Sequence, residues 1–493
     1  MNKIYTFRPV RWKMILPAIL CVSLACNLLE IGVEEQSTPT DTIESATITH
    51  VAPGPSTQES TAPQEEVYYV APTGDDANPG TKAQPWRTIQ KAVDTLTAGE
   101  TVNIRAGTYN EHVLLTRSGS QGQFITFAAY PGESATVDAE GLAIDEEGGV
   151  FEIDGLSFIR IAGLRIVNSS GAGILTNQAS DIYIEGNYTY NTVSSGIGVW
   201  RSHNTIIDGN EVELANNDGE QECITVAGTD GFEVRNNHVH HSGPGTRGGE
   251  GIDVKDGSSN GMVYRNHVHD LPARLGIYID AWDKHTYNIR VFQNIVHDVG
   301  DSGFTLASEA GGLLENIHVF NNIAFHNKYD GITISGCCSY LASEHPMRNL
   351  FIINNTFYNN GWEEWGGGIN SENVEAQNVI IRNNIVSQNL LYQVFLEQGV
   401  PAKEYFIDHN LIYGYRNFEG ELYGNEYVEG DPLFINPSVA DFHLGANSPA
   451  IDHCNASEAP TDDYDGNSRP QDGDQDSIAI CDIGAYETQP AAP

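Results

Sequence analysis

Apolar and polar positions alternate over short stretches of this chain, and an asparagine recurs within them. Nine segments follow the form aliphatic-x-x-Asn-x-aliphatic, and successive asparagines are separated by 23 to 33 residues. That spread excludes a strict helical repeat and suits short strands joined by turns of variable length. The nine residues are Asn187, Asn210, Asn237, Asn266, Asn294, Asn322, Asn355, Asn384 and Asn410.

The recurring asparagine has a physical role that few other residues fill. Its side-chain amide both donates and accepts, so stacked copies at one bend can hydrogen-bond from coil to coil inside a core. Asparagine also tolerates the left-handed backbone that a sharp bend between strands requires. The chain has neither the leucine ladder of a leucine-rich repeat nor the longer repeat of a propeller. The pattern therefore predicts a parallel β-helix.

A second strand pattern, glycine followed by apolar-x-apolar, recurs about midway between the asparagines. Alternation directs the second and fourth residues into the core and the third and fifth outward. These strands begin at Gly196, Gly251, Gly276, Gly303 and Gly331. Their outward positions include Trp200 in one coil, Asp253 and Lys255 in a later coil, and Tyr278 and Asp280 in the next.

In these features the chain resembles the right-handed parallel β-helix proteins of the pectin-lyase-like group. In that group the second strand forms the floor of the substrate groove. Residues 67–113 also resemble the opening of secreted β-helix enzymes that include family 9 polysaccharide lyases. The segment Asp482-Ile483-Gly484-Ala485-Tyr486-Glu487 resembles the tail module of bacterial surface β-helix proteins.

The predicted fold is all-β: a single-stranded right-handed parallel β-helix over residues 67–425 with a small C-terminal tail or capping module over 426–493. Near the start of the β-helix, four apolar residues fall on one helical face and predict a short helix that caps the open end of the coils. They are Trp86, Ile89, Val93 and Leu96.

The overall charge restricts the partners. The chain has 25 Lys and Arg against 66 Asp and Glu, which gives a net charge of −41. Such an acidic protein repels phosphate backbones, so nucleic-acid binding is disfavoured. The mean hydropathy of −0.31 excludes a polytopic membrane protein. We expect a monomer whose partner is a polysaccharide.

The N-terminus is typical of an export signal. Four basic residues precede a short apolar run over residues 14–20, which is too short to span a bilayer comfortably. Residues 23–26, Ser-Leu-Ala-Cys, resemble a bacterial lipobox, so we predict a leader over residues 1–26 with lipidation of Cys26; an ordinary cleaved signal is the alternative. Residues 27–66, rich in Ser, Thr and Pro, then form a disordered tether. The protein is therefore expected at the cell surface or outside the cell, with membrane contact only through the lipid.

Cysteine usage agrees with export. Cys454 and Cys481 both lie in the last segment and are predicted to form a disulfide there, while no CxxC metal spacing occurs. The remaining cysteines, Cys223, Cys337 and Cys338, leave an odd thiol.

Charged side chains gather on the second strand of two adjacent coils. Strands of a sheet lie about 4.8 Å apart, so Lys255 and Asp280 are expected to be lateral neighbours on the outward face. Beyond the strand ends lie Asp256, Trp282, Asp283 and Glu309, and the loops that lead into these strands supply Arg247, Glu250 and Arg274.

Carboxylates gathered near one lysine would repel one another unless a hard cation lies among them. Calcium takes oxygen ligands from clusters of this kind in exported proteins. We therefore predict a calcium site whose candidate ligands are Asp253, Asp256, Asp280, Asp283 and Glu309. The alternative is an exposed ion pair on a stable sheet, which would contribute only about 0–1 kcal/mol.

Three functions compete for this surface, and the lyase ranks first. The resemblance to family 9 lyases implies a calcium-dependent polysaccharide lyase for uronic-acid glycans, in which Lys255 abstracts the C5 proton. Its catalytic set is Lys255, Asp280, Arg247 and Arg274. An inverting glycoside hydrolase would instead use Asp253, Asp280 or Glu309 as acid and base. A non-catalytic surface glycan binder would use the stacking platforms Trp200, Tyr278 and Trp282.

A column of histidines follows the asparagine ladder. His240, His269 and His297 each come three residues after a ladder asparagine, which places them in line on the next strand. The spacing alone favours a stacking column over a transition-metal site.

Overall fold

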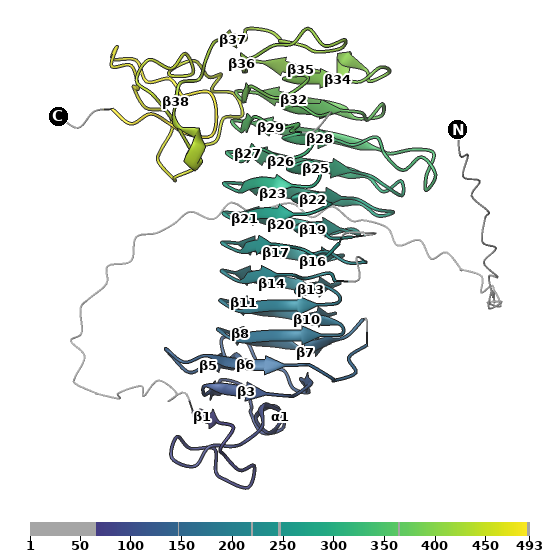
Figure 1. The fold of residues 1–493 in the computed structure, drawn as a ribbon, viewed down its shortest axis with the longest axis vertical. Helices are drawn as coiled ribbons and strands as arrows, with labels where there is room; N and C mark the ends of the chain where they lie inside the picture. The colour runs from purple at the N-terminus through teal and green to yellow at the C-terminus, as the bar shows by residue number, and fades with distance from the viewer. Residues whose placement is uncertain (1–65, 146, 218–219, 245–247, 363–364, 491–493) are drawn as a thin grey trace, which may run out of the picture. The chain divides into compact units, whose positions relative to one another are not determined.

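The short strands stack into coils, and each coil contributes one strand to each of three parallel sheets (Figure 1). The computed structural model describes residues 66–490 except 146, 218–219, 245–247 and 363–364. The predicted leader with Cys26 and the tether up to residue 65 lie outside the described residues. Within the described part, no helix is both long and apolar enough to cross a membrane.

Sheet I has 11 strands within the described residues. They are β4 (Val113–Leu114), β7 (Gly149–Asp154), β10 (Ala172–Asn177), β13 (Ile197–Trp200), β16 (Ile224–Ala227), β19 (Ile252–Lys255), β22 (Ile277–Asp280), β25 (Phe304–Ala307), β28 (Ile332–Ile334), β31 (Ile369–Ser371) and β34 (Val394–Leu396).

Sheet II follows sheet I in each coil and has 13 described strands. They are β1 (Val67–Val70), β2 (Thr101–Ile104), β5 (Ile125–Ala129), β8 (Ser157–Ala162), β11 (Ser180–Glu185), β14 (His203–Asp208), β17 (Asp230–Arg235), β20 (Ser259–Tyr264), β23 (Thr286–Phe292), β26 (Leu314–Phe320), β29 (Met347–Ile353), β32 (Gln377–Arg382) and β35 (Tyr405–Asp408).

Sheet III completes each coil and also has 13 described strands. They are β3 (Gly107–Tyr109), β6 (Ala135–Asp138), β9 (Arg165–Ser169), β12 (Tyr188–Thr192), β15 (Glu211–Glu213), β18 (His238–His240), β21 (His267–Leu271), β24 (Ile295–Val299), β27 (Ile323–Phe325), β30 (Thr356–Tyr358), β33 (Ile385–Ser387), β36 (Leu411–Tyr413) and β37 (Val428–Glu429).

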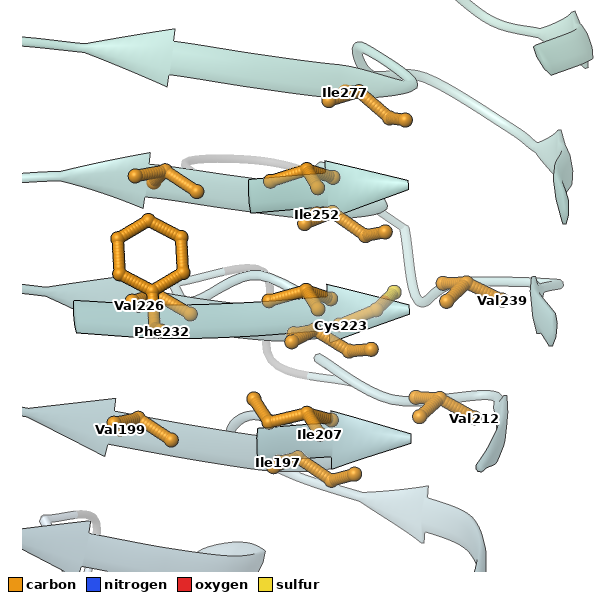
Figure 2. Packing of buried hydrophobic residues seen from close by; sticks show 14 of the residues in the cluster. Ile197, Val199, Ile207, Val212, Cys223, Val226, Phe232, Val239, Ile252 and Ile277 are labelled. Carbon is orange, nitrogen blue, oxygen red and sulfur yellow. The ribbon is translucent and has the colours of Figure 1, made fainter. Parts of the chain in front are cut away.

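The core is a set of columns in which like side chains lie above one another. In sheet I the register aligns Ile197, Ile224, Ile252 and Ile277 on successive strands, and each is at most 1% exposed. Figure 2 shows these stacked aliphatic side chains together with those of the other two sheets. The inward positions are therefore those that the alternation predicts.

The asparagine ladder forms as predicted. Each Nδ2 donates to the Oδ1 of the next asparagine at 2.9–3.1 Å, from Asn187 through to Asn410. The same Oδ1 also accepts from the backbone N–H of the preceding ladder residue, for example Asn294 N to Asn322 Oδ1 at 3.0 Å. The left-handed residue of the bend is the one before the ladder asparagine, such as Gln293 (φ 55°) or Asn321 (φ 52°), and not the ladder residue itself.

The N-terminal end is closed as the sequence predicts. Helix α1 (Ile89–Val93) begins after Thr88, whose side chain accepts from Lys91 N. The four predicted face residues are each at most 3% exposed, although Trp86 precedes the helix and Leu96 follows it. A short apolar helix therefore covers the first coils, which would otherwise expose their core.

The C-terminal segment lies beside sheet III rather than across the end of the coils (Figure 1). It contains the hairpin of β38 (Phe434–Asn436) and β39 (Asp441–Leu444), and a 3₁₀ turn (Pro437–Val439) joins these strands; another such turn, Ala402–Glu404, precedes β35. Phe442 is buried against Phe325 and Tyr358 of sheet III.

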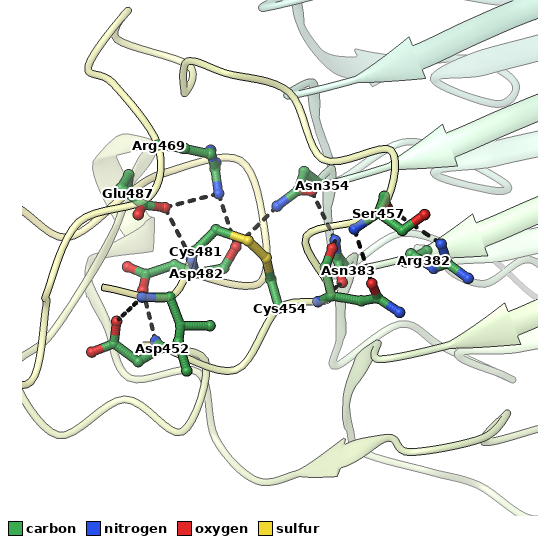
Figure 3. The surroundings of a disulfide bond; sticks show 12 residues. Asn354, Arg382, Asn383, Asp452, Cys454, Ser457, Arg469, Cys481, Asp482 and Glu487 are labelled. Atoms are coloured by element: carbon green, nitrogen blue, oxygen red, sulfur yellow. Dashed lines mark hydrogen bonds and ion pairs between the residues drawn. A yellow bond between two sulfur atoms is a disulfide. The ribbon is translucent and has the colours of Figure 1, made fainter. Parts of the chain in front are cut away.

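Polar contacts fix this segment to the bend that carries the ladder. The left-handed residues of successive bends donate to its backbone carbonyls: Gln293 to Asp463 at 2.6 Å, Asn321 to Asp462 at 2.7 Å and Asn354 to Asp482 at 2.9 Å. Figure 3 shows the same region, where the predicted disulfide Cys454–Cys481 lies near a buried ion pair between Arg469 and Glu487.

Replacing Asn294 by leucine tests the ladder. The change removes the acceptor of Asn266 Nδ2 and the donor to Val263 O, both buried. We expect a loss of about 1–3 kcal/mol of unfolding free energy, since unpaired buried amides lose their full solvation. Denaturant unfolding measures it, and Asn103→Leu on the outer face of β2 is the matched control. Equal stability of the two variants would contradict the ladder's role.

Candidate functional site

The predicted site residues lie on the face of sheet I opposite the core. Ile252 and Val254 of β19 point into the core, whereas Asp253 and Lys255 occupy the other face. Asp253 is paired with Tyr278 of β22 in the strand register. Lys255 and Asp280 are the last residues of their strands, and each directly follows the last printed pair of the register, Val254 with Ile279.

The expectation that this face is exposed is wrong. Asp253, Tyr278 and Asp280 are only 2%, 5% and 1% exposed. Neighbouring segments contribute to this burial: Glu222 from the loop before β16 binds Lys255, and the backbone N–H of Glu309 donates to Asp280 Oδ1 at 3.1 Å. Strand alternation identifies the face that a side chain occupies but not the segments that cover this face. Tyr278 is too buried to be an exposed stacking platform.

Lys255 is held by two carboxylates that are themselves buried. Its Nζ lies 2.5 Å from Glu222 Oε1 and 3.1 Å from Asp253 Oδ2. The side chains of Lys255, Glu222 and Asp253 are 19%, 6% and 3% exposed. Within the described residues, these two carboxylates and not Asp280 are the ion-pair partners of Lys255.

Glu222 is a site residue that the sequence reasoning missed. It precedes Ile224 of β16 by two residues, just as Glu250 precedes Ile252 of β19, and the two segments are hydrogen-bonded through Cys223 N and Glu250 O. Glu222 also accepts from Thr225 Oγ1 at 2.7 Å. The repeated offset is the signal in the sequence that could have identified it, because Glu222 occupies in its coil the position that Glu250 occupies in the next.

Asp280 and Glu309 form a second contact across neighbouring coils. Tyr278 Oη donates to Glu309 Oε1 at 2.5 Å, and Glu309 N binds Asp280. Cys337 and Cys338 of the following turn form a disulfide beside Glu309, whereas Cys223 is free and buried. The predicted pair Asp280 and Glu309 is therefore brought together.

Burial dominates the protonation behaviour of the carboxylates. Burial, reinforced by the charge of Glu222, raises the pKa of Glu250 to about 7, although Arg274 and Lys255 oppose the rise. Burial likewise raises the pKa of Asp280 to about 7 and raises that of Asp253.

Lys255 behaves in the opposite way. Burial disfavours its charged form, but Glu222 and Asp253 outweigh burial and raise the pKa of Lys255. With these carboxylates as its partners, Lys255 is therefore a cation at neutral pH.

Other predicted site residues lie elsewhere. Asp256 pairs with Lys284 at 2.7 Å in the turns after β19 and β22, so its charge is neutralised outside the buried cluster. Asp283 is exposed in the turn after β22, and Trp282 beside it is 39% exposed. The structure therefore does not bring the five predicted calcium ligands together. Arg247 lies outside the described residues.

A cavity of about 430 Å³ adjoins the cluster on sheet I. It is lined by Trp200 and Arg201 and by polar side chains of the earlier coils, and Gln221 of its wall directly precedes Glu222. Trp200 is aligned with Ala227, and Ala227 with Lys255, so Trp200 lies two strands, or roughly 9–10 Å, from the lysine. The cavity therefore lies over earlier coils of the sheet that carries Lys255.

Two carboxylate oxygens of the cluster lack a hydrogen-bond partner within the described residues. They are Glu250 Oε2 and Asp253 Oδ1, and both are buried. A buried oxygen without a partner costs free energy. Carboxylate oxygens are also the ligands that a hard divalent cation prefers.

The stacked coils and their three parallel sheets define a parallel β-helix protein. The family described as "Pel9A-like, right handed beta helix region" matches residues 68–361. The chain belongs to this family, and its β-helix is right-handed.

Individual relatives agree with this assignment. Uncharacterized protein YwoF of Bacillus subtilis (strain 168) is 29% identical over 338 residues, which cover 61% of this chain and 70% of YwoF. Pectate lyase PEL9 of Emericella nidulans is 31% identical over 140 residues, 26% of this chain and 34% of that enzyme. The crystal structure of pectate lyase Pel9A shares the fold, with a TM-score of 0.53 at 15% identity, covering 86% of this chain and 97% of Pel9A.

Glu250 provides a pH test. Its folded pKa of about 7 exceeds the ordinary value of 4.5, so between these values the folded state binds the extra proton and stability falls as pH rises. In chelator-treated protein, the unfolding free energy of Glu250→Gln should rise relative to that of the parent between pH 5 and pH 8, by on the order of 1–3 kcal/mol. Chemical unfolding at both pH values measures the gain. Glu140→Gln, at an exposed position, is the control; a pH-independent difference for Glu250→Gln would refute the assignment.

Proposed function

We propose that this protein is an exported polysaccharide lyase that cleaves uronic-acid-containing glycans by β-elimination. The observation that carries the proposal is Lys255, a partly buried lysine held by the buried carboxylates of Glu222 and Asp253 on sheet I. The cavity at Trp200 supports it, because a glycan bound there extends toward the lysine. Family membership and the similarity to the pectate lyase PEL9 agree with a carbohydrate-active enzyme.

We also propose that calcium binds at this cluster. The candidate ligands are Glu222, Glu250 and Asp253, because they combine carboxylate chemistry with the two unpartnered oxygens. Asp280 and Glu309 lie on the neighbouring coils. When bound, calcium would supply positive charge that acidifies the C5 proton of a uronate.

The residues of the chain then have distinct tasks. Lys255 would act as the base, and to accept the C5 proton it must first lose the proton that Glu222 and Asp253 stabilise on it. The C4–O bond breaks as the C4=C5 double bond forms. The leaving oxygen takes a proton from water, and the proton on Lys255 returns to the solvent. Trp200 and Arg201 would orient the sugar ring and its carboxylate in the cavity.

A glycoside hydrolase is the second candidate, and one observation favours it. Burial raises the pKa of both Asp280 and Glu250 to about 7, so either carboxyl can be protonated near neutral pH and serve as a general acid. The two mechanisms differ in their products, because only elimination leaves an unsaturated sugar.

A polysaccharide panel separates these mechanisms. Homogalacturonan, alginate and glucuronan, with neutral glycans as controls, are incubated with and without a calcium chelator. Absorbance growth at 235 nm that the chelator abolishes supports the lyase; new reducing ends without absorbance support the hydrolase. Binding without either product would indicate a surface glycan binder.

Lys255→Arg tests the base directly. Arginine keeps the positive charge between Glu222 and Asp253 but cannot be deprotonated, so the fold should be retained while turnover falls by two to four orders of magnitude. Lys255→Ala should also destabilise the protein, by about 3–5 kcal/mol, because it leaves buried carboxylates without a partner. Initial rates and thermal melts measure both effects, with the exposed Lys403→Ala as control. Full activity of Lys255→Arg would remove the mechanism.

Trp200 and Trp282 make a matched pair for substrate binding. Trp200 lines the cavity, whereas Trp282 is exposed in the turn after β22. Trp200→Ala should raise KM by about 3–10-fold with little change in kcat, the size expected for one aromatic contact. Trp282→Ala should leave KM nearly unchanged. A larger rise in KM for Trp282→Ala than for Trp200→Ala, measured on the active polysaccharide, would place the sugar outside the cavity.

A further inference from the structure

The outer face of sheet III carries a cluster of histidines that the catalytic proposal does not use. The strand register stacks His238 on His267, and His240 on His269 and then on His297. Val239, Val268 and Val296 between them point into the core and are fully buried. Alternation therefore places two columns of imidazoles side by side, with ring centroids of neighbouring histidines 4.3–5.4 Å apart.

The imidazole nitrogens face one another across these columns. His238 Nε2 lies 2.7 Å from His269 Nε2, and His267 Nε2 lies 2.8 Å from His297 Nε2. One ligand atom each from His238, His267 and His269 lies within 4.8 Å of the others. A simple stacking column requires ring contacts, but it does not require nitrogens to converge in this way.

Carboxylates orient two of the rings from behind. Asp270 Oδ2 lies 2.7 Å from His269 Nδ1, and Asp298 Oδ2 lies 2.7 Å from His297 Nδ1. Both aspartates have left-handed backbones, with φ of 52° and 53°. A carboxylate on Nδ1 fixes the N–H there and leaves the lone pair on Nε2. This is the outer-shell arrangement found around metal-bound histidines.

We propose that His238, His267 and His269 form a site for a divalent transition metal of the zinc class, with Asp270 positioning His269. Three imidazole nitrogens suit zinc, nickel or copper rather than calcium, and they leave a fourth position for water. Nitrogens bound to one tetrahedral zinc at 2.0–2.1 Å lie roughly 3.3 Å apart, so small rotations of the rings suffice to admit the ion.

Such an ion would link two neighbouring coils at the side wall of the β-helix. His238 belongs to β18, and His267 and His269 belong to β21. The site lies on a different sheet from Lys255, so its occupancy and the proposed lyase activity can be measured separately.

Zinc binding to untagged, chelator-stripped full-length protein tests the proposal. A competition titration with a chromophoric chelator should give one tightly bound Zn²⁺ per chain, which millimolar Ca²⁺ does not displace. Co²⁺ in place of Zn²⁺ should give the visible absorption of a four-coordinate site. Absence of saturable binding would overturn the proposal.

Variants locate the ion. His238→Ala and His269→Ala should each abolish tight binding, and Asp270→Asn should weaken it by about 10–100-fold, the usual effect of removing an outer-shell carboxylate. His203→Ala, at an exposed histidine of sheet II, is the matched control and should bind like the parent. Thermal melts test whether each variant is folded. If an alanine variant does not fold, the zinc affinity of Asp270→Asn decides the question. Unchanged affinity in His269→Ala, or in a folded Asp270→Asn, would overturn the assignment.

Discussion

From the coil of Asn187 to that of Asn410, each coil of this protein is bound to the next by strand hydrogen bonds and by a buried amide at the bend between sheets II and III. The amide chain runs without a break from Asn187 to Asn410 and also takes up backbone N–H groups of the bend. Because each asparagine binds the asparagine at the equivalent position of the next coil, the ladder fixes the register of the coils. Side chains at equivalent positions then lie in columns on all three sheets. The core, the candidate site and the histidine cluster are all such columns.

The ladder constrains the strands but leaves the segments between sheets III and I free to vary in length. In the middle coils these segments bring Glu222 and Glu250 beside the outward residues of β16 and β19. The result is a polar cluster with several carboxylates, which repel one another and are held by Lys255 with Arg274 nearby. Burying several like charges together does not favour stability. Groups whose pKa values are shifted by burial and by neighbouring charges occur often at functional sites.

The same bend also positions the C-terminal segment. The left-handed residue before each ladder asparagine points its side chain away from the core, and in four successive coils it donates to carbonyls of residues 455–482. Two neighbouring positions in the sequence thus have separate roles: one stabilises the stack, and the other binds the added segment. Phe325, which stacks on His297, also contacts Phe442 of this segment, so the histidine columns end where the C-terminal segment begins to cover sheet III.

The sequence by itself determined the features that repeat. Nine asparagines, the alternation of strands such as Ile252–Lys255 and the apolar face at Trp86 specify coils, inward positions and the N-terminal helix, because each depends on local periodicity. Only the tertiary structure decided what depends on loops and on contacts across coils. It buried Asp280, paired Lys255 with Glu222 rather than Asp280, and left Asp256 with Lys284 outside the cluster. It also brought the Nε2 atoms of histidines in neighbouring columns face to face, which their spacing in the sequence does not predict. These diagonal contacts depend on side-chain rotamers and on the backbone bends at Asp270 and Asp298. Periodicity fixes which face a side chain occupies, whereas burial and charge pairing depend on what folds over that face.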